Sequence, residues 1–367
     1  MKQNEKPLKP KDPRPLPKNH RRCLKNDYHG RCIYMVTLCT EGRKPILGTL
    51  EGDSPESAFI RPTPLGEKVL QCWNDIPALQ RQFAAKKSER IGKTCKRNIS
   101  LIGHQLMPDH FHGIIFVREE MDISVGDVIR GFMVGCTKAY NTLLHKPEDG
   151  KPLKPLWGKG YHDRILWHAG QLQNMINYVR DNPRRLMVKR MHSDCFAVMR
   201  DVRYGERTFS TVGNLHLLDD ILTAVHVRSA WPEEEKRNYM NHCIMAARQG
   251  TALIGPFISP WEKMVLEVAL KEGLPIILLV PHAFTNYYKP PGNLFDACSH
   301  GNLLLLSEVS PESPSSRRIS REECVALNAL AGELAGHRVA EDVFLLQSFS
   351  EFGATNTSLS GTGGGAV

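Results

Sequence analysis

The sequence predicts two folded parts of different class, an α+β part with an antiparallel sheet followed by an α/β part. In the first half, periodic segments follow one another as strand, helix, strand, strand, helix, strand, helix. In the second half, short and wholly apolar runs alternate with helical segments, which is typical of a parallel sheet. The net charge also changes sign between the halves.

Each element of the first half follows from its own pattern. β-Branched and apolar residues predict strands at 31–40, 99–107, 111–118 and 161–167. Helical spacing predicts helices at 64–83 (interrupted at Pro77), 125–145 and 169–183. The last helix should end near Asn182, because Pro183 disfavours helical geometry in the residue before it. This order fits a ferredoxin-like layer, an antiparallel sheet with helices on one face and the other face open to a ligand.

The second half has shorter elements. Apolar runs predict strands at 221–231, 251–258, 274–281 and 302–309, and helices are expected at 233–248, 260–272, 292–300 and 320–335. We therefore expect a first domain at 23–195 and a second domain at 215–340. Residues 1–22, rich in Pro, Lys and Arg, predict a disordered basic arm, and residues 341–367 predict a mostly disordered tail.

Charge is distributed unevenly along the 367 residues, whose formal net charge is +9. Residues 1–200 contain 35 Lys and Arg against 20 Asp and Glu, whereas the remaining residues contain 13 against 19. A strongly basic half predicts contact with a polyanion, most simply nucleic acid. The alternative is a basic surface that serves solubility alone.

The composition also narrows the class of protein. No apolar run approaches the length of a membrane helix, and the N-terminus has no apolar signal region. The ten cysteines form no C-x-x-C pair, and several lie in apolar runs, as reduced core cysteines do. We expect a cytoplasmic protein without a membrane partner.

Residues 107–115 read MPDHFHGII and place two histidines on one strand. Side chains at i and i+2 of a strand share a face, with Cα atoms about 6.6 Å apart. His110 and His112 can therefore bind one divalent metal ion, while Phe111 points to the opposite face. The alternative is a pair of neutral histidines that are held by hydrogen bonds.

The helix at 169–183 carries a tyrosine away from its core stripe. The stripe consists of Leu172, Met175, Ile176 and Val179. Tyr178 lies roughly 105° from the centre of this stripe, and Asn182 shares its side of the helix. Taken alone, such a tyrosine is an ordinary surface residue. Basic residues crowd the same segment, as phosphate binding would require: Arg180, Arg184, Arg185, Lys189 and Arg190.

Four segments stand in a characteristic order and spacing: HQLMPDHFHGIIFV, VIRGFMVGCTKAYN, LWGKGYHDRIL and INYVRDNPRRL. They resemble the REP-associated tyrosine transposases, which belong to the IS200/IS605-like, single-tyrosine HUH nucleases. MPDHFH is moderately specific by itself, and with YVRDNP about 70 residues downstream it is strongly so. The resemblance covers about residues 20–190.

The resemblance implies a metal-dependent transposase and endonuclease that cleaves and rejoins single-stranded DNA, often beside a hairpin. His110 and His112 would hold Mg²⁺ or Mn²⁺, and Asn182 would be a third ligand or a polar support. Tyr178 would attack the scissile phosphate, forming a 5′-phosphotyrosine link and releasing a 3′-OH. The sequence leaves open whether the chain works as a monomer or as a homodimer.

Single-stranded DNA is bound by basic side chains along its backbone and by aromatic side chains that stack on its bases. The basic segment and the resemblance together give the following DNA-binding candidates: Arg130, Lys138, Tyr161, Arg180, Arg184, Arg185 and Lys189. Trp157 and His162 are further stacking candidates, although Trp157 also fits a core position. Met133 stands where the family commonly has a lysine.

The second half has neither a G-x-G-x-x-G fingerprint nor a Walker loop, so no nucleotide cofactor is expected. TALIGPFISPWEKMVLEVALKEGLPIILLV and KPPGNLFDACSHGNLLLLSEV weakly resemble the Rossmann-like fold of the DprA/SLOG proteins, over about 215–335. Gly255, Pro256 and Ser259 would lie where α/β sheets bind ligands, and Ser259 fits a helix cap equally well. The resemblance implies an accessory domain whose ligand is unknown.

Two other functions stay open at this point. The same basic sheet could bind DNA or RNA without catalysis. His110 and His112 could also serve a zinc hydrolase, but no H-E-x-x-H or C-x-x-C nearby supplies further ligands. A denaturation-resistant adduct between protein and DNA distinguishes the nuclease from both.

Overall fold

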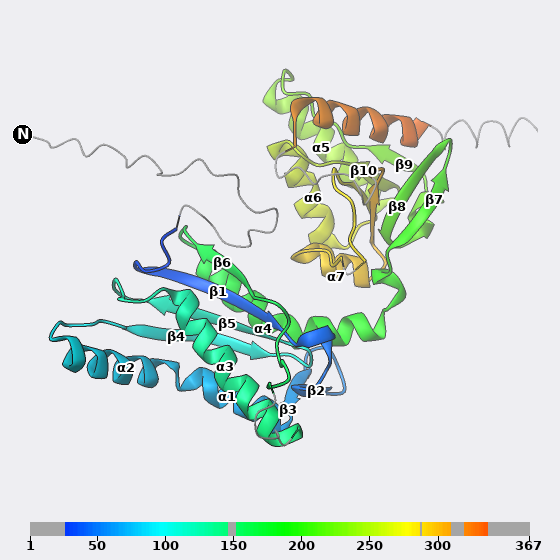
Figure 1. The fold of residues 1–367 in the computed structure, drawn as a ribbon. Helices are drawn as coiled ribbons and strands as arrows, with labels where there is room; N and C mark the ends of the chain where they lie inside the picture. Colours follow the sequence, from blue (N-terminus) through cyan, green and yellow to red (C-terminus); the bar gives the residue numbers. More distant parts are fainter. Residues whose placement is uncertain (1–25, 146–151, 287, 310–318, 337–367) are drawn as a thin grey trace, which may run out of the picture. The chain divides into compact units, whose positions relative to one another are not determined.

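The structure is a computed structural model that describes residues 26–145, 152–286, 288–309 and 319–336 (Figure 1). The chain divides between Met187 and Val188 into two compact units. The basic arm expected at 1–22 and the tail expected at 341–367 lie outside the described residues. The domain ranges 23–195 and 215–340 stay predictions.

The first unit is built on a four-stranded antiparallel sheet whose strands match those expected from the sequence. They are β1 (Cys32–Cys39), β4 (Ile99–Leu106), β5 (His110–Val117) and β6 (His162–Leu166). In space they follow the order β4-β5-β1-β6. Thr37 of β1 and Gln105 of β4 are the cross-strand partners of His112 on β5. Cross-strand partners share a face, so the sheet places these three side chains together.

Three helices pack on one face of this sheet: α1 (Pro64–Asn74), α2 (Ile76–Ile91) and α3 (Val125–Leu144). The helix expected at 64–83 is thus two helices, because Pro77 stands at the start of α2, where its missing N–H costs nothing. Trp73 of α1 lies with its ring centroid 5.0 Å from that of Phe111, and Phe132 of α3 lies 5.5 Å from the same ring. Phe111 therefore anchors the sheet to both helices.

Between β1 and α1 the chain forms a small separate sheet. The 3-10 helix η1 (Glu41–Arg43) leads to β2 (Gly48–Glu51), which pairs with β3 (Phe59–Pro62) in antiparallel fashion. The side chain of Thr63 then caps α1 by accepting a hydrogen bond from the Gly66 N–H. This cap fixes where α1 begins.

The fourth helix, α4 (Gln171–Met191), packs on the opposite face, so the expectation that all helices share one face was wrong (Figure 1). Met175 and Val179 of α4 form an apolar cluster with Met35 of β1 and Ile114 of β5. The strand residues in this cluster alternate with those that face α1 and α3. Apolar residues on both faces of a strand indicate a sheet that is covered twice.

α4 also continues through Pro183 to Met191, whereas the sequence predicted an end near Asn182. Proline has no N–H, so the carbonyl of Val179, four residues earlier, lacks its usual helical donor. The side-chain Nδ2 of Asn182 lies 3.3 Å from the Val179 oxygen and 2.9 Å from the Tyr178 oxygen. This substitute donor, together with packing on the sheet, outweighs the extended preference of the residue before proline.

Asn182→Ala is therefore expected to lower the free energy of unfolding by about 1–2 kcal/mol, because a buried carbonyl loses its donor. In a Pro183→Ala background the cost should shrink by about 1 kcal/mol, since an alanine at this position supplies the missing backbone N–H. Urea denaturation of the wild type, the two single variants and the double variant measures the cost of Asn182→Ala in both backgrounds. Equal costs in the two backgrounds would mean that Asn182 does not replace the missing donor.

The second unit contains a six-stranded mixed sheet in the order β7-β8-β12-β11-β10-β9. Four strands are parallel, as the apolar runs predicted: β9 (Leu222–Ala224), β10 (Ala252–Gly255), β11 (Ile276–Leu279) and β12 (Leu303–Ser307). β7 (Met199–Tyr204) and β8 (Arg207–Gly213) continue the sheet in antiparallel fashion. These two polar strands were missed because their composition resembles a linker. The short 3-10 helices η2 (Asp194–Phe196) and η3 (Leu215–Leu218) flank them.

Helices pack on both faces of the second sheet. One apolar cluster contains residues of α5 (Glu233–Arg248), α6 (Pro260–Glu272) and α7 (Asn293–Ser299). On the other face, Leu330 and Leu334 of the helix at 321–336 pack on the strands. Ser259 is a helix cap: its hydroxyl accepts from the Glu262 N–H, and the Glu262 carboxylate accepts from the Ser259 N–H. Across the described part of the chain, no helix is both long and apolar enough to cross a membrane.

Candidate active site

The two histidines of β5 lie side by side on the face of the sheet that α4 covers. Their ring centroids are 4.8 Å apart, and the rings are nearly perpendicular. His112 is buried and His110 is half-buried. Strand alternation explains the arrangement, because Phe111 between them points into the core on the side of α1 and α3.

The Nδ1 atom of each histidine is hydrogen-bonded to a side-chain oxygen. Asp109 Oδ1 lies 2.6 Å from His110 Nδ1, and the hydroxyl of Thr37 lies 2.8 Å from His112 Nδ1. Thr37 reaches His112 because the two residues are cross-strand partners. Such hydrogen bonds fix the orientation of each ring, and the bond to the Asp109 carboxylate favours the tautomer in which Nε2 of His110 can coordinate.

Tyr178 reaches the same place from α4. The centroid of its ring lies 5.9 Å from that of His112, and the residue is 43 % exposed. Met175 and Val179, on the neighbouring stripe of the helix, are buried against the sheet. Tyr178 therefore stands at the margin of the packed stripe, where it is open to solvent and close to the histidine pair.

The histidine pair fits a divalent metal ion in donor type and orientation. Imidazole nitrogens bind several divalent metals, and metal-bound histidines almost always bond through the other ring nitrogen to an oxygen. Within residues 26–336, leaving out the gaps in the description, no three His, Cys, Asp or Glu side chains gather into a metal cluster. A metal held here would take its remaining ligands from amide, water or substrate oxygens, which suits Mg²⁺ and Mn²⁺.

Asn182, one turn after Tyr178, is buried, and its side-chain nitrogen is engaged with the backbone of α4. Only its amide oxygen could therefore ligate a metal ion. Asn182 already serves the helix by donating to the carbonyl that Pro183 leaves without a donor. Its position on the same side of α4 as Tyr178 therefore does not by itself imply metal binding.

The basic residues of α4 differ in their surroundings. Arg180 is exposed and lies directly after Val179. The guanidinium of Arg184 pairs with Asp181, and Arg185 is largely buried. Lys189 belongs to the second unit, beyond the division of the chain. Arg180 is thus the exposed basic residue of this group in the first unit, and it projects from the side of α4 away from Tyr178.

Arg130 and Lys138 are not brought to the histidine pair. Both are exposed on α3, which packs on the opposite face of the sheet, and Arg130 pairs with Asp127. Of the three stacking candidates between residues 157 and 162, Trp157 and Tyr161 are buried in the core on that same opposite side. His162 is exposed and is the cross-strand partner of Thr37, on the face of the histidine pair.

Three residues of the site were missed in the sequence. Asp109 stands in the same motif, directly before His110, and its position next to a candidate metal ligand was the available signal. Thr37 and Gln105 come from other strands, and only the register of the sheet brings them beside His112. Periodicity within one segment carries no information about such cross-strand partners.

Asp109 is held as a carboxylate. Burial opposes its ionisation, but the hydrogen bond with His110 and the guanidinium of Arg43, 3.2 Å away, together lower the pKa of Asp109. A charged acceptor strengthens the bond to the imidazole N–H and makes the ring a better ligand.

Asp109→Ala is accordingly expected to weaken Mn²⁺ affinity about 10–100-fold, because His110 loses the partner that orients it. Calorimetric titration of the intact protein with Mn²⁺ measures this. Asp53→Ala, at an exposed aspartate in the β2–β3 connection, is the control and should bind as wild type. Unchanged affinity in Asp109→Ala would contradict an orienting role for this carboxylate.

No protein-family model and no curated protein matches the chain. Among solved structures, a REP-associated tyrosine transposase bound to a REP hairpin is 14 % identical with a TM-score of 0.24, over 43 % of this chain and 70 % of that one. A candidate transposase from Deinococcus radiodurans R1 is also 14 % identical, with a TM-score of 0.23, over 43 % of this chain and 95 % of that one. Similarity at this level carries no argument about function.

Proposed function

We propose that the first unit is a metal-dependent transposase and endonuclease for single-stranded DNA. It cleaves and rejoins strands near hairpins through a 5′-phosphotyrosine intermediate, with Tyr178 as the nucleophile and with Mg²⁺ or Mn²⁺ on His110 and His112. The antiparallel unit is a ferredoxin-like catalytic domain, and the second unit is a Rossmann-like accessory domain.

A single observation carries this proposal: a solvent-exposed tyrosine stands beside two histidines whose Nδ1 atoms are hydrogen-bonded to side-chain oxygens. The ring of Tyr178 is 5.9 Å from His112, and the ring of His112 is 4.8 Å from His110. A pair of neutral structural histidines would explain the bonds to Asp109 and Thr37. It would not explain why a different element, the helix α4, brings an exposed tyrosine to the same place.

The chemistry follows from these positions. The hydroxyl oxygen of Tyr178 attacks the phosphorus of one phosphodiester and forms a new O–P bond, giving up its proton. The P–O3′ bond breaks, and the departing 3′ oxygen takes up a proton to become a 3′-OH. When bound, the metal ion supplies neutralisation of charge on the phosphate oxygens. The phosphotyrosine ester retains the bond energy, so a 3′-OH from another strand can reverse the step and be joined.

The burial of His112 beside Tyr178 favours a flexible strand as substrate. A phosphate must lie against both the tyrosine on α4 and the histidines on β5, and a single strand can bend into that position. Arg180 of the same helix is exposed and can contact the DNA.

The test uses hairpin DNAs with randomised single-stranded flanks, incubated with the intact protein and Mn²⁺ and then denatured. A 5′-phosphotyrosine link retains the DNA on the 3′ side of the break. We therefore expect that 3′-labelled DNA migrates with the denatured protein and that 5′-labelled DNA is released. A chelator should abolish both signals.

Binding of these DNAs without any adduct would favour a non-catalytic nucleic-acid-binding protein on the same sheet. Retention of the 5′ label instead of the 3′ label would contradict the polarity of the proposed link. Adduct formation that persists in chelator would show that the reaction does not need a metal ion.

A further inference from the structure

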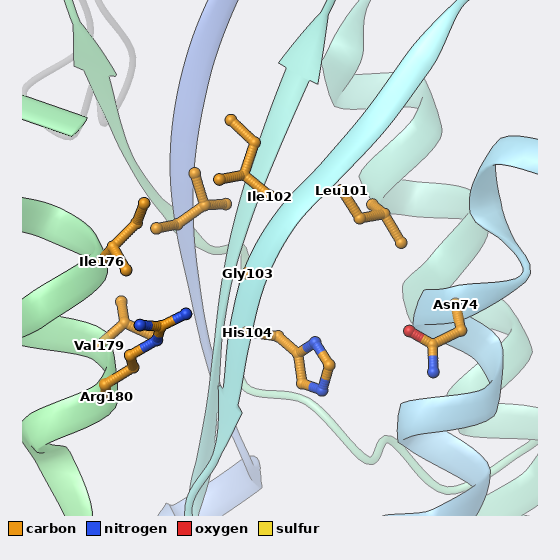
Figure 2. A pocket seen from close by; sticks show the side chains of 9 residues that line it. Asn74, Leu101, Ile102, Gly103, His104, Ile176, Val179 and Arg180 are labelled. Atoms are coloured by element: carbon orange, nitrogen blue, oxygen red, sulfur yellow. The ribbon is translucent and has the colours of Figure 1, made fainter. Parts of the chain in front are cut away.

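A pocket of about 370 Å³ opens around strand β4, the edge strand of the first sheet. Figure 2 shows the side chains that line it, with Ile176, Val179 and Arg180 of α4 on one side and Asn74 of α1 on the other. Gly103 of β4 stands between them. The pocket is separate from the histidine pair, and the chemistry proposed for Tyr178 does not use it.

Two features of β4 create this space. The pairing of β4 with β5 shifts register between Leu101 and Gly103, so an irregularity interrupts the edge. Gly103 has no side chain, and a Cβ atom built on it would meet nothing within 4 Å. The backbone of Gly103 is not in the left-handed region, so a larger residue is compatible with its geometry.

The lining suits a flat ligand with two apolar faces and a polar edge. Aliphatic side chains form much of the wall: Leu101, Ile102, Ile114, Ile176 and Val179. Asn74, His104 and Arg180 supply the polar groups. Desolvation lowers the pKa of His104 and so favours the neutral ring, which can donate or accept a hydrogen bond. A nucleobase has this combination of apolar faces and hydrogen-bonding edge.

The pocket lies next to the proposed site along both elements that build it. Ile114 is two residues after His112 on β5, so its side chain is on the same face and about 7 Å further along the strand. On α4, Val179 directly follows Tyr178, and Arg180 projects from the other side of the helix, toward β4. A strand whose phosphate lies at Tyr178 would therefore bring a neighbouring nucleotide to Gly103.

We propose that this pocket takes one unpaired nucleobase of the DNA strand, next to the phosphate that Tyr178 attacks, and that Arg180 and Asn74 bind its polar edge. The assignment rests on the proposed function of the site. It adds a determinant of specificity: the pocket selects the strand by the base it accepts at one position.

The test combines a protein variant whose pocket is filled, Gly103→Leu, with DNAs that lack one base near the cleaved phosphate. From the hairpin library, one DNA that forms the adduct with the wild-type protein is chosen, and each nucleotide that flanks the cleaved phosphate is replaced in turn by an abasic residue. At one position the wild-type protein should lose roughly tenfold or more in adduct formation at limiting protein. Gly103→Leu should lose a similar factor with the unmodified DNA and should be insensitive to the abasic residue at that position.

Gly332→Leu is the matched control, because this glycine is exposed in the second unit and also has free space around it. It should behave as wild type toward every DNA. Arg180→Ala provides a second variant that leaves the backbone of β4 unchanged, and it should weaken discrimination among bases at the same position. Thermal unfolding verifies that each variant is folded.

Three results would overturn the assignment. Adducts that tolerate an abasic residue at every flanking position would show that no base is held. A folded Gly103→Leu that reacts as wild type would show that the pocket is not used. If the wild-type protein forms no adduct with any DNA, the proposed function itself fails, and the pocket assignment fails with it.

Discussion

Tyr178→Phe is expected to abolish the covalent protein–DNA adduct, with a loss of roughly 10³-fold or more in strand cleavage. The substitution removes only the hydroxyl oxygen, which is the atom that would form the bond to phosphorus. The side chain is 43 % exposed, so the free energy of unfolding should change by less than about 0.5 kcal/mol. DNA binding, measured by fluorescence anisotropy, should therefore stay close to that of the wild type while cleavage is lost.

Asn177→Ala is a matched control for this experiment. Asn177 is the exposed neighbour of Tyr178 on α4, and its side chain accepts a hydrogen bond only from Gln173, one turn earlier, among the contacts described. It should keep both binding and cleavage. An adduct that still forms with Tyr178→Phe would show that Tyr178 is not the nucleophile. Equal losses of DNA binding and cleavage would show that the tyrosine has only a structural role.

His110→Ala and His112→Ala should each reduce Mn²⁺-dependent cleavage by about 100-fold, because one of two protein ligands to the metal is lost. Part of the activity should return at high Mn²⁺ concentration in the single variants, whereas the double variant should stay inactive. Measuring cleavage rate against Mn²⁺ concentration separates weaker metal binding from a folding defect, since a folding defect is not restored by metal.

His216→Ala serves as the control, because this histidine is exposed in the second unit and far along the chain from β5. Its dependence on Mn²⁺ should be that of the wild type. If His110→Ala and His112→Ala keep the same dependence on Mn²⁺ as the wild type, the pair is a hydrogen-bonded structural feature and the metal binds elsewhere or not at all.

Much of the first unit could be predicted from local sequence. The strand pattern placed β1, β4, β5 and β6, and the helical stripe placed α3, because period 2 and period 3.6 are visible within a single segment. The same reasoning put His110 and His112 on one face and turned Tyr178 away from the core stripe. These are properties of one element at a time.

The remaining features depend on how elements meet. Helical periodicity places Tyr178 on α4 but does not say which face of the sheet α4 will cover, and the expected single-sided layer was wrong for that reason. The continuation of α4 through Pro183 depends on a side-chain bond from Asn182 that local propensity does not describe. The partner Thr37 and the pocket at Gly103 follow from register and from an irregular strand edge.

The proposal that Tyr178 is the nucleophile is tested most directly by identifying the residue that is bonded to DNA. The adduct is digested with nuclease and trypsin, and the peptide that carries the remaining nucleotide is sequenced by mass spectrometry. Trypsin should release residues 165–180 as one peptide, in which Tyr178 is the sole tyrosine. We expect the nucleotide on Tyr178 of this peptide, because Tyr178 is the proposed nucleophile. A nucleotide on any other residue would contradict this proposal.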